Sequence, residues 1–455
     1  MNKNKHAEFI AIVAIVAIVA IVVLIQMASL KKMPATSIVG QAASIQTLSV
    51  EKIRAERLVP PSPYEEIDQD LYNMVIQGGS DGESGGQNFL PCTPVGQEFF
   101  DDLPLPNQPL NTGCYELSEN VQSSGTLYLA GDVEFKGNGH TITGNFQEYG
   151  IYATQNAVVR DLVVRNMRTG YYLTDNTQVI SCTATIMLEI GFKMYGSSQA
   201  QGCTASFAQT AGFKLNTAGT RVTNSNALNN GDAQHHANGF ELLAGTVGDG
   251  SMASYNSGYG FYLTYSSKLS LVTAGVSARY NNIGIAMTGN SYSQGSIGSV
   301  WSTNNNIGYQ LEQSARFLEH GYIRGDSNVI GYKLLDNTQF ASPVAVSNTD
   351  YGIWMDGSTN TDRPYAYSVN ADFNNNGVYV GGNAFLNVGN RVCDSDTRNI
   401  FVNQGKVRGT YATTTIQGTG NIQVTYTACH QGGGGGGSGS PIFYKPGSPA
   451  QQGMN

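Results

Sequence analysis

A repeat of the form Gly, apolar, any residue, apolar limits what this 455-residue chain can fold into more than any other feature. Successive copies are 20 to 27 residues apart, and in the last two copies Asn replaces Gly. The copies begin at Gly150, Gly170, Gly191, Gly212, Gly239, Gly260, Gly284, Gly308, Gly331, Gly352, Gly377, Asn399 and Asn421. Since Asn tolerates a positive φ better than most residues, the exchange suggests that the turn before each strand needs this conformation.

The two apolar positions of the repeat are separated by one residue, which is the spacing of side chains on one face of a β-strand. The first is occupied by Ile, Tyr, Phe or Val, as in Phe213 and Tyr309, and the third by Leu, Met, Val or Ala, as in Leu215. We therefore expect both positions to be buried and the second position to face outward. Thirteen copies of one strand predict that the strands stack in a single parallel sheet.

A coil of 20 to 27 residues has room for about three short strands and three turns, as in a parallel β-helix. Leucine-rich repeats, propeller blades of about 40 residues and hexapeptide β-helices have different spacings. The composition agrees, because the chain has 55 Gly and 25 Tyr but only 13% charged residues, unlike a helical protein. The predicted class is all-β, a solenoid of about 13 coils.

The segment from Gly137 to Gly144, GNGHTITG, follows Tyr128 to Val133 and resembles the opening coil of right-handed parallel β-helix repeat proteins. These are pectate-lyase-like proteins and include carbohydrate-binding, sugar-hydrolase and periplasmic copper-site accessory types. The later units Asn281-Asn282-Ile283-Gly284 and Asn304 to Gly308 are similar, and the resemblance spans about residues 114 to 425. It implies the fold and a link to carbohydrates, but no particular activity, because lyases, hydrolases, epimerases and adhesins share the fold.

The chain divides into four predicted regions: a membrane anchor (1–30), a stem (31–91), the capped β-helix (92–430) and a Gly/Ser/Pro-rich flexible tail (431–455). The anchor is inferred from the apolar run Phe9 to Ile25, flanked by lysines. A cleaved signal peptide and a buried soluble helix are alternatives. We expect the β-helix to face the cell exterior or the periplasm, where the tail could contact another surface protein. The net charge of −8 argues against nucleic acid as a partner.

Three pairs of cysteines are candidates for disulfides in such an oxidising compartment. Cys182 and Cys203 each precede a repeat glycine by nine residues, so they should stack on adjacent coils, either bonded or as buried thiols. The other pairs, Cys92 with Cys114 and Cys393 with Cys429, flank the two ends of the repeat array and could staple its caps.

The coil of 27 residues contains the only adjacent histidines of the chain. Asp232, His235 and His236 could bind a divalent metal or supply an acid and a base. A solvated polar turn is the alternative, because neighbouring side chains on an extended segment point apart and no third strong ligand is evident. Apart from this metal, we expect no cofactor.

The outward second positions form a partly aromatic stripe that could stack on the apolar faces of sugar rings. The predicted glycan-binding residues are Tyr152, Tyr172, Lys193, Lys214, Tyr262, Trp354, Tyr379 and Phe401. Ordinary β-propensity would explain the same aromatics in a purely structural or adhesive rod.

Two other functions stay open. A polysaccharide lyase or glycoside hydrolase would need converging carboxylates, and the candidates Asp232, Asp249, Asp326, Asp356 and Asp372 are scattered over different coils. A metal-handling periplasmic accessory protein would use the histidine loop. The sequence favours a cell-surface protein that binds glycan or serves as a structural rod, and no catalytic residue can be named.

Overall fold

A computed structural model describes residues 91–101, 109–232, 234–271, 274–295, 299–318, 322–357, 363–388, 392–393, 395, 398–412 and 416–427. Within these ranges no helix is long and apolar enough to cross a membrane. The predicted anchor, almost all of the predicted stem and the predicted tail lie outside them.

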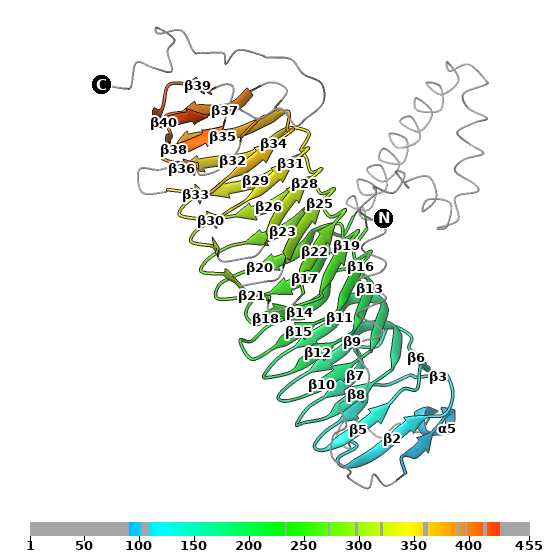
Figure 1. Ribbon diagram of the computed structural model, residues 1–455. Coiled ribbons are helices and arrows are strands. Elements are labelled where there is room, and N and C mark those ends of the chain that lie inside the picture. Colours follow the sequence, from blue (N-terminus) through cyan, green and yellow to red (C-terminus); the bar gives the residue numbers. More distant parts are fainter. Residues whose placement is uncertain are drawn as a thin grey trace, which may run out of the picture. The chain divides into compact units, whose positions relative to one another are not determined.

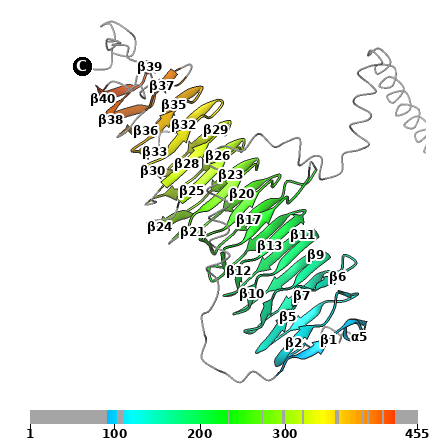
Figure 2. The same ribbon diagram turned by 45° about the vertical axis from the view of Figure 1, so that its right-hand side comes forward.

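Most coils contribute a strand to each of three stacks, which we call the Gly-led face, the third face and the sixteen-stranded face (Figure 1). The chain runs from the sixteen-stranded face to the third face, then to the Gly-led face, and through a turn to the next coil. All pairings between these strands are parallel, so the predicted parallel β-solenoid of about 13 coils is confirmed. The turned view in Figure 2 shows the same stacking.

The Gly-led face begins with β4 (Leu127–Leu129) and ends with β39 (Ile416–Gly418). Its other strands are β7 (Tyr149–Ala153), β9 (Val163–Leu173), β11 (Thr183–Met194), β14 (Ala211–Leu215), β17 (Asn238–Leu242), β20 (Tyr259–Leu263), β23 (Ile283–Met287), β26 (Ile307–Leu311), β29 (Ile330–Leu335), β32 (Tyr351–Gly357), β35 (Asn376–Gly382) and β37 (Arg398–Asn403). Only the second halves of β9 and β11 belong to it, because their first halves lie in the third face.

The third face also contains β3 (Val121–Gln122), β6 (Thr141–Thr143), β13 (Thr204–Ala208), β16 (Asn226–Leu228), β19 (Met252–Ser254), β22 (Val276–Arg279), β25 (Ser299–Thr303), β28 (Tyr322–Asp326), β31 (Val344–Val346) and β34 (Asn370–Asp372). The sixteen-stranded face contains β1 (Thr93–Val95), β2 (Gly113–Leu117), β5 (Val133–Lys136), β8 (Val158–Arg160), β10 (Gln178–Ile180), β12 (Gln199–Gln201), β15 (Arg221–Thr223), β18 (Thr246–Gly248), β21 (Lys268–Leu271), β24 (Tyr292–Gly295), β27 (Arg316–Phe317), β30 (Gln339–Ala341), β33 (Tyr365–Tyr367), β36 (Phe385–Val388), β38 (Lys406–Ala412) and β40 (Asn421–Thr427).

The interior of the solenoid is lined by the first and third positions of the repeat, which are buried as predicted wherever their burial is described. Aromatic rings at the first position stack from coil to coil. The rings of Phe192, Phe213, Phe240 and Phe261 form one such column, with centroids 4.7 to 4.8 Å apart. This distance matches the spacing of neighbouring strands, so backbone pairing and ring stacking reinforce each other.

The prediction that all thirteen copies share one sheet is wrong at the C-terminal end. The copy that begins at Asn421 is strand β40, which pairs with β38 on the sixteen-stranded face. Ile416 instead follows Ile400 on the Gly-led face. At the other end, Leu127 pairs with Ile151, so the face starts one coil before the first recognisable glycine. The repeat pattern alone cannot distinguish the faces, because alternating strands occur on all three.

The proposed reason for the repeat glycines is also wrong. None of them has a positive φ; that conformation occurs at other turn positions, such as Asp161, Ser181 and Asn224. The glycines are needed because neighbouring coils approach closely. A Cβ atom on Gly260 would lie 2.6 Å from the carbonyl oxygen of Gly284 and 2.8 Å from the side-chain nitrogen of Asn281. Such distances exclude any side chain without a backbone shift.

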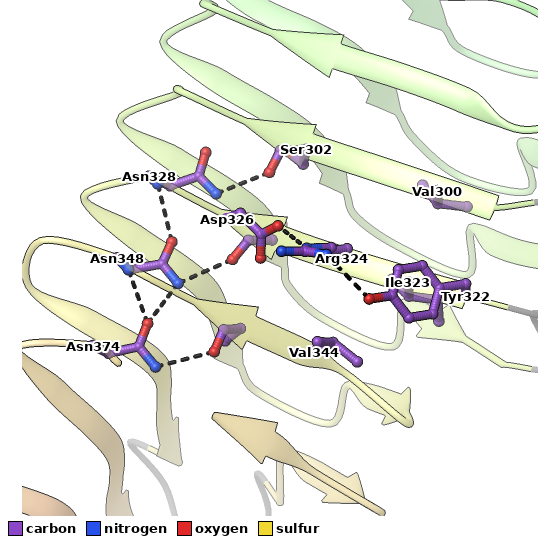
Figure 3. Close-up of polar contacts among 12 residues, drawn as sticks. Val300, Ser302, Tyr322, Ile323, Arg324, Asp326, Asn328, Val344, Asn348 and Asn374 are labelled. Carbon is purple, nitrogen blue, oxygen red and sulfur yellow. Dashed lines mark hydrogen bonds and ion pairs between the residues drawn. The ribbon is translucent and has the colours of Figure 1, made fainter. Parts of the chain in front are cut away.

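A buried asparagine ladder lies beside these glycines, at the turn between the third face and the Gly-led face. Its members are Asn230, Asn256, Asn281, Asn305, Asn328, Asn348 and Asn374. Figure 3 shows the last three rungs, in which Asn348 Nδ2 donates to Asn374 Oδ1 at 2.8 Å and to the carbonyl oxygen of Gly325. The backbone N–H of each rung donates to the next Oδ1, so the ladder satisfies polar groups that the turn would otherwise bury unpaired.

The first coil is capped by the short helix α5 (Gln97–Asp101), whose Phe100 is buried against the core. A disulfide joins Cys92 to Cys114 beside this cap, as predicted. Cys393 is also in a disulfide, and its predicted partner Cys429 lies outside the described residues. Because disulfides are typical of oxidising compartments, the Cys92–Cys114 bond supports an extracytoplasmic location.

A disulfide between Cys182 and Cys203 does not form. Both residues are buried free thiols. Each Sγ donates to backbone carbonyl oxygens, that of Cys182 to Ile180 and that of Cys203 to Gln201, so the thiols serve as packing groups with local hydrogen bonds. Burial, together with the neighbouring Cys182, raises the pKa of the Cys203 thiol well above its usual value.

Candidate functional site: the outer surface of the Gly-led face

The predicted glycan-binding residues all lie in outward register positions of the Gly-led face, partly exposed, as the alternation of the repeat requires. Tyr152 pairs with Tyr172, which pairs with Lys193 and then Lys214. Ala286 is an exception to the predicted facing, because this second-position side chain is buried. The stripe is therefore interrupted at Ala286, and most of its aromatics fall into two clusters, one toward each end of the face.

The C-terminal cluster contains Tyr351, Trp354, Tyr379 and Phe401 from strands β32, β35 and β37. Trp354 pairs with Tyr379 and Tyr379 with Phe401, so the three rings occupy consecutive coils. Trp354 and Tyr379 meet edge to face with centroids 5.8 Å apart, and Tyr379 and Phe401 are stacked at the same separation. The ring of Tyr351 lies 5.7 Å from Trp354. All four are partly exposed, which leaves ring surface available to a ligand.

Polar groups border this C-terminal cluster. The ammonium of Lys333 lies 5.9 Å from the Trp354 ring centroid. Asn403 Nδ2 donates to the Tyr379 hydroxyl at 3.4 Å. Asp356 follows Trp354 by two residues on the same strand and is likewise partly exposed. Aromatic surface with a cation, an amide and a carboxylate at its edge is an arrangement that suits sugar rings and their hydroxyls.

The N-terminal cluster is built from five tyrosines, Tyr128, Tyr149, Tyr152, Tyr172 and Tyr195. The rings of Tyr152 and Tyr172 are stacked, with centroids 5.0 Å apart and planes at 9°. Partial burial and the neighbouring Tyr195 raise the pKa of Tyr172 to about 12. Tyr172 therefore stays a neutral hydrogen-bonding group at physiological pH.

The cation of the N-terminal cluster is Lys193, whose ammonium lies 5.5 Å from the Tyr172 centroid and 5.9 Å from that of Tyr195. The tyrosine side chains pack against one another as well as facing outward. The cluster is consequently a tighter surface than the row around Trp354.

Between the clusters the face is more polar. Lys214 Nζ and Glu241 Oε1 form an ion pair at 2.7 Å on adjacent coils. Tyr262 stacks on Tyr259 with centroids 4.7 Å apart and lines a hollow of about 320 Å³ together with Tyr265. Lys214 is thus engaged with a carboxylate, which leaves it a weaker candidate for ligand contact than Lys193.

Sequence reasoning missed several aromatics of these clusters. Tyr149, Tyr259 and Tyr351 all stand immediately before a repeat glycine, a position that simple alternation would place inside. Their rings nevertheless contact outward-facing rings of the same strands, as Tyr149 contacts Tyr152 and Tyr351 contacts Trp354. The recurrence of tyrosine at this position was the signal available in the sequence.

The five aspartates considered for catalysis do not gather at one place. Asp232 and Asp249 lie in connections between strands, and Asp356 lies on the Gly-led face. Asp326 and Asp372 are two coils apart on the third face, with Val346 between them. Asp326 pairs with Arg324, which also donates to the Tyr322 hydroxyl (Figure 3). Asp372 accepts a hydrogen bond from the backbone N–H of Cys393.

The histidine loop is organised by Asp232. Its Oδ1 accepts hydrogen bonds from the backbone N–H groups of Gln234 and His235, and lies 2.9 Å from His235 Nδ1. These two backbone donors, with the His235 ring, lower the pKa of Asp232. Across the described ranges, His, Cys, Asp and Glu nowhere form a group of three that could hold a metal. A metal at Asp232, His235 and His236 stays a prediction.

Comparison with known proteins adds little to this description. No protein-family model and no curated protein match the sequence. Among solved structures, a mutant of the periplasmic alginate epimerase AlgG is similar at 10% identity and a TM-score of 0.35, covering 73% of this chain and 83% of that one. ORF18 of Geobacillus virus E2 is similar at 8% identity and a TM-score of 0.24, covering 78% and 65%. At such TM-scores the two structures support no statement about what this chain binds.

Proposed function

We propose that this protein is an extracytoplasmic β-solenoid that binds a glycan chain along the C-terminal aromatic cluster of its Gly-led face. The observation that carries the proposal is the row of Trp354, Tyr379 and Phe401, which stand in register on three consecutive coils with partly exposed rings. Three coils place the outer rings about 10 Å apart, close to the length of about two sugar rings. The row is long enough to hold a chain rather than a single monosaccharide.

The chemistry of the surroundings fits an oligosaccharide with free hydroxyls. Sugar rings would stack their C–H faces on the aromatics, while Lys333, Asp356 and Asn403 would meet the hydroxyls at the edge. The N-terminal tyrosine cluster would be a second contact on the same face. Two sites on one rod would raise the apparent affinity for a long glycan through avidity.

A glycan array followed by titration of a positive glycan tests the proposal. Trp354→Ala should weaken binding by about 1 to 3 kcal/mol, which is roughly 5- to 150-fold in Kd. The matched control is Trp301→Ala, because Trp301 is the other tryptophan of the chain and lies on the third face. The control should keep the wild-type affinity.

The same experiments distinguish the other functions. Chemical turnover of a bound glycan by the wild-type protein would favour the lyase or hydrolase. Metal retention that depends on His235 would favour the metal-handling protein. If no glycan binds and Trp354→Ala only lowers stability, the aromatics are scaffold and the solenoid is a structural rod.

A further inference from the structure

The outer surface of the sixteen-stranded face carries a row of cations with a regular spacing. Arg221 pairs in register with Thr246 and Thr246 with Lys268. Lys268 pairs with Tyr292 and Tyr292 with Arg316. The three cations, which we call the basic row, therefore stand on every second coil, about 10 Å apart and about 20 Å from end to end.

Carboxylates do not neutralise the basic row. Among the described residues, Arg221, Lys268 and Arg316 form no ion pair, and the outward register positions between them hold Thr246 and Tyr292. At the N-terminal end of the same face the situation differs, because Arg160 Nε lies 3.0 Å from Glu134 Oε1. In a chain of net charge −8, unpaired cations aligned on one face are a feature that ordinary surface composition does not explain.

A groove adjoins the first cation. It has a volume of about 270 Å³ and is lined by Gln178, Gln199, Gln201, Arg221 and Thr223 on three consecutive strands. The carboxamides can donate to and accept from hydroxyl groups, and the Arg221 guanidinium can grip a carboxylate with two hydrogen bonds.

Further along the row, Tyr292 is 39% exposed, and its ring centroid lies 5.8 Å from Lys268 Nζ. An exposed ring between two cations supplies an apolar contact for a sugar ring. Amides, cations and an aromatic ring therefore follow one line on this face.

We propose that this line is a second binding site, specific for a linear acidic polysaccharide whose carboxylates meet the basic row. A chain lying along the solenoid would present a carboxylate to a cation every second coil, and the glutamine-lined groove would hold the hydroxyls at one end. Duplex DNA carries a phosphate about every 3.4 Å along each strand, so three cations over about 20 Å would neutralise few of its charges. Two sugar rings of a single polysaccharide chain span about 10 Å, so a chain that turns the carboxylate of every second sugar toward the row would meet each cation in turn.

The site goes beyond the proposed function, because it lies on another face, uses charge rather than aromatic stacking and could exist without the Trp354 row. Binding of polygalacturonate to the intact protein should be measurable at low salt and should weaken as salt rises. The variant Arg221→Gln/Lys268→Gln/Arg316→Gln should lose about 10- to 100-fold in affinity, since each exposed charge pair contributes up to about 1 kcal/mol. Trp354→Ala should bind polygalacturonate as the wild type does.

A control with the same change in net charge removes three cations of strands β9 and β22, as Arg165→Gln/Arg168→Gln/Arg279→Gln. Both triple variants change the net charge from −8 to −11, by three charges each, so a general effect of net charge would be the same in both. The control should keep the wild-type affinity for polygalacturonate.

Three results would overturn the proposal: no binding of polygalacturonate at low salt, equal losses in the two triple variants, or equally tight binding of single-stranded DNA. The last result would make the row a general polyanion surface. If polygalacturonate does not bind the basic row but Trp354→Ala still weakens binding of a neutral glycan, the proposed function stands without the second site. If polygalacturonate binds the basic row but Trp354→Ala has no effect on any glycan, only the second site stands.

Discussion

Replacing Asn281 by alanine should destabilise the solenoid more than any exposed substitution of the same chemistry. Its Oδ1 accepts from Asn256 N at 3.0 Å and from Asn256 Nδ2 at 2.9 Å. Its Nδ2 donates to the carbonyl oxygen of Ala253 at 3.1 Å and to Asn305 Oδ1 at 3.2 Å. Four hydrogen bonds at about 1 kcal/mol each, with buried partners left unsatisfied, give a loss of about 3 to 5 kcal/mol.

The neighbouring Asn282→Ala variant is the control. Asn282 is exposed, so its loss should change the free energy of unfolding by no more than about 0.5 kcal/mol. Urea unfolding followed by far-UV circular dichroism compares both variants with the wild type. Equal midpoints for the two variants would refute the conclusion that the buried ladder holds neighbouring coils together.

Three further predictions follow from the fold and its tyrosines. Phe213→Ala should lower the free energy of unfolding in urea by about 3 to 5 kcal/mol, because it leaves a cavity in the column of stacked rings. Lys214→Ala should lower it by about 1 kcal/mol or less, and similar losses in the two variants would contradict the assigned facing. Thiol titration without reductant should detect Cys182 and Cys203 only after denaturation, and a fully oxidised chain would contradict their free state. The free energy of unfolding should fall as pH rises from 10 to 12, because the unfolded state loses the Tyr172 proton near pH 10 and the folded state keeps it until about 12. Tyr172→Phe should make this fall of the free energy of unfolding with pH less steep, and an equally steep fall would contradict the raised pKa.

The sequence was sufficient to predict which side chains line the interior. A period of two is imposed by strand geometry, and burial of residues such as Phe213 and Leu215 follows directly from it. The outward register of Trp354, Tyr379 and Phe401 was predictable for the same reason.

Features that depend on the contact between coils were not predictable from the pattern. The glycines looked like turn residues, but the nearby carbonyl oxygens and asparagine amides of the next coil are the reason for them. Cys182 and Cys203 have the spacing of stacked residues, and spacing does not determine whether the thiols bond. The basic row was not predicted because Arg221, Lys268 and Arg316 lie outside the Gly-led repeat. They align only when the strand that each coil contributes to the sixteen-stranded face is known.

Single-tryptophan fluorescence tests the glycan proposal most directly, because the chain has two tryptophans and they lie on different faces. In the Trp301→Phe variant all tryptophan emission comes from Trp354, and in Trp354→Phe all of it comes from Trp301. The account predicts that a glycan found on the array shifts or quenches the emission of Trp301→Phe in a saturable way and leaves that of Trp354→Phe unchanged. Saturable quenching of Trp301 with a silent Trp354 would contradict it.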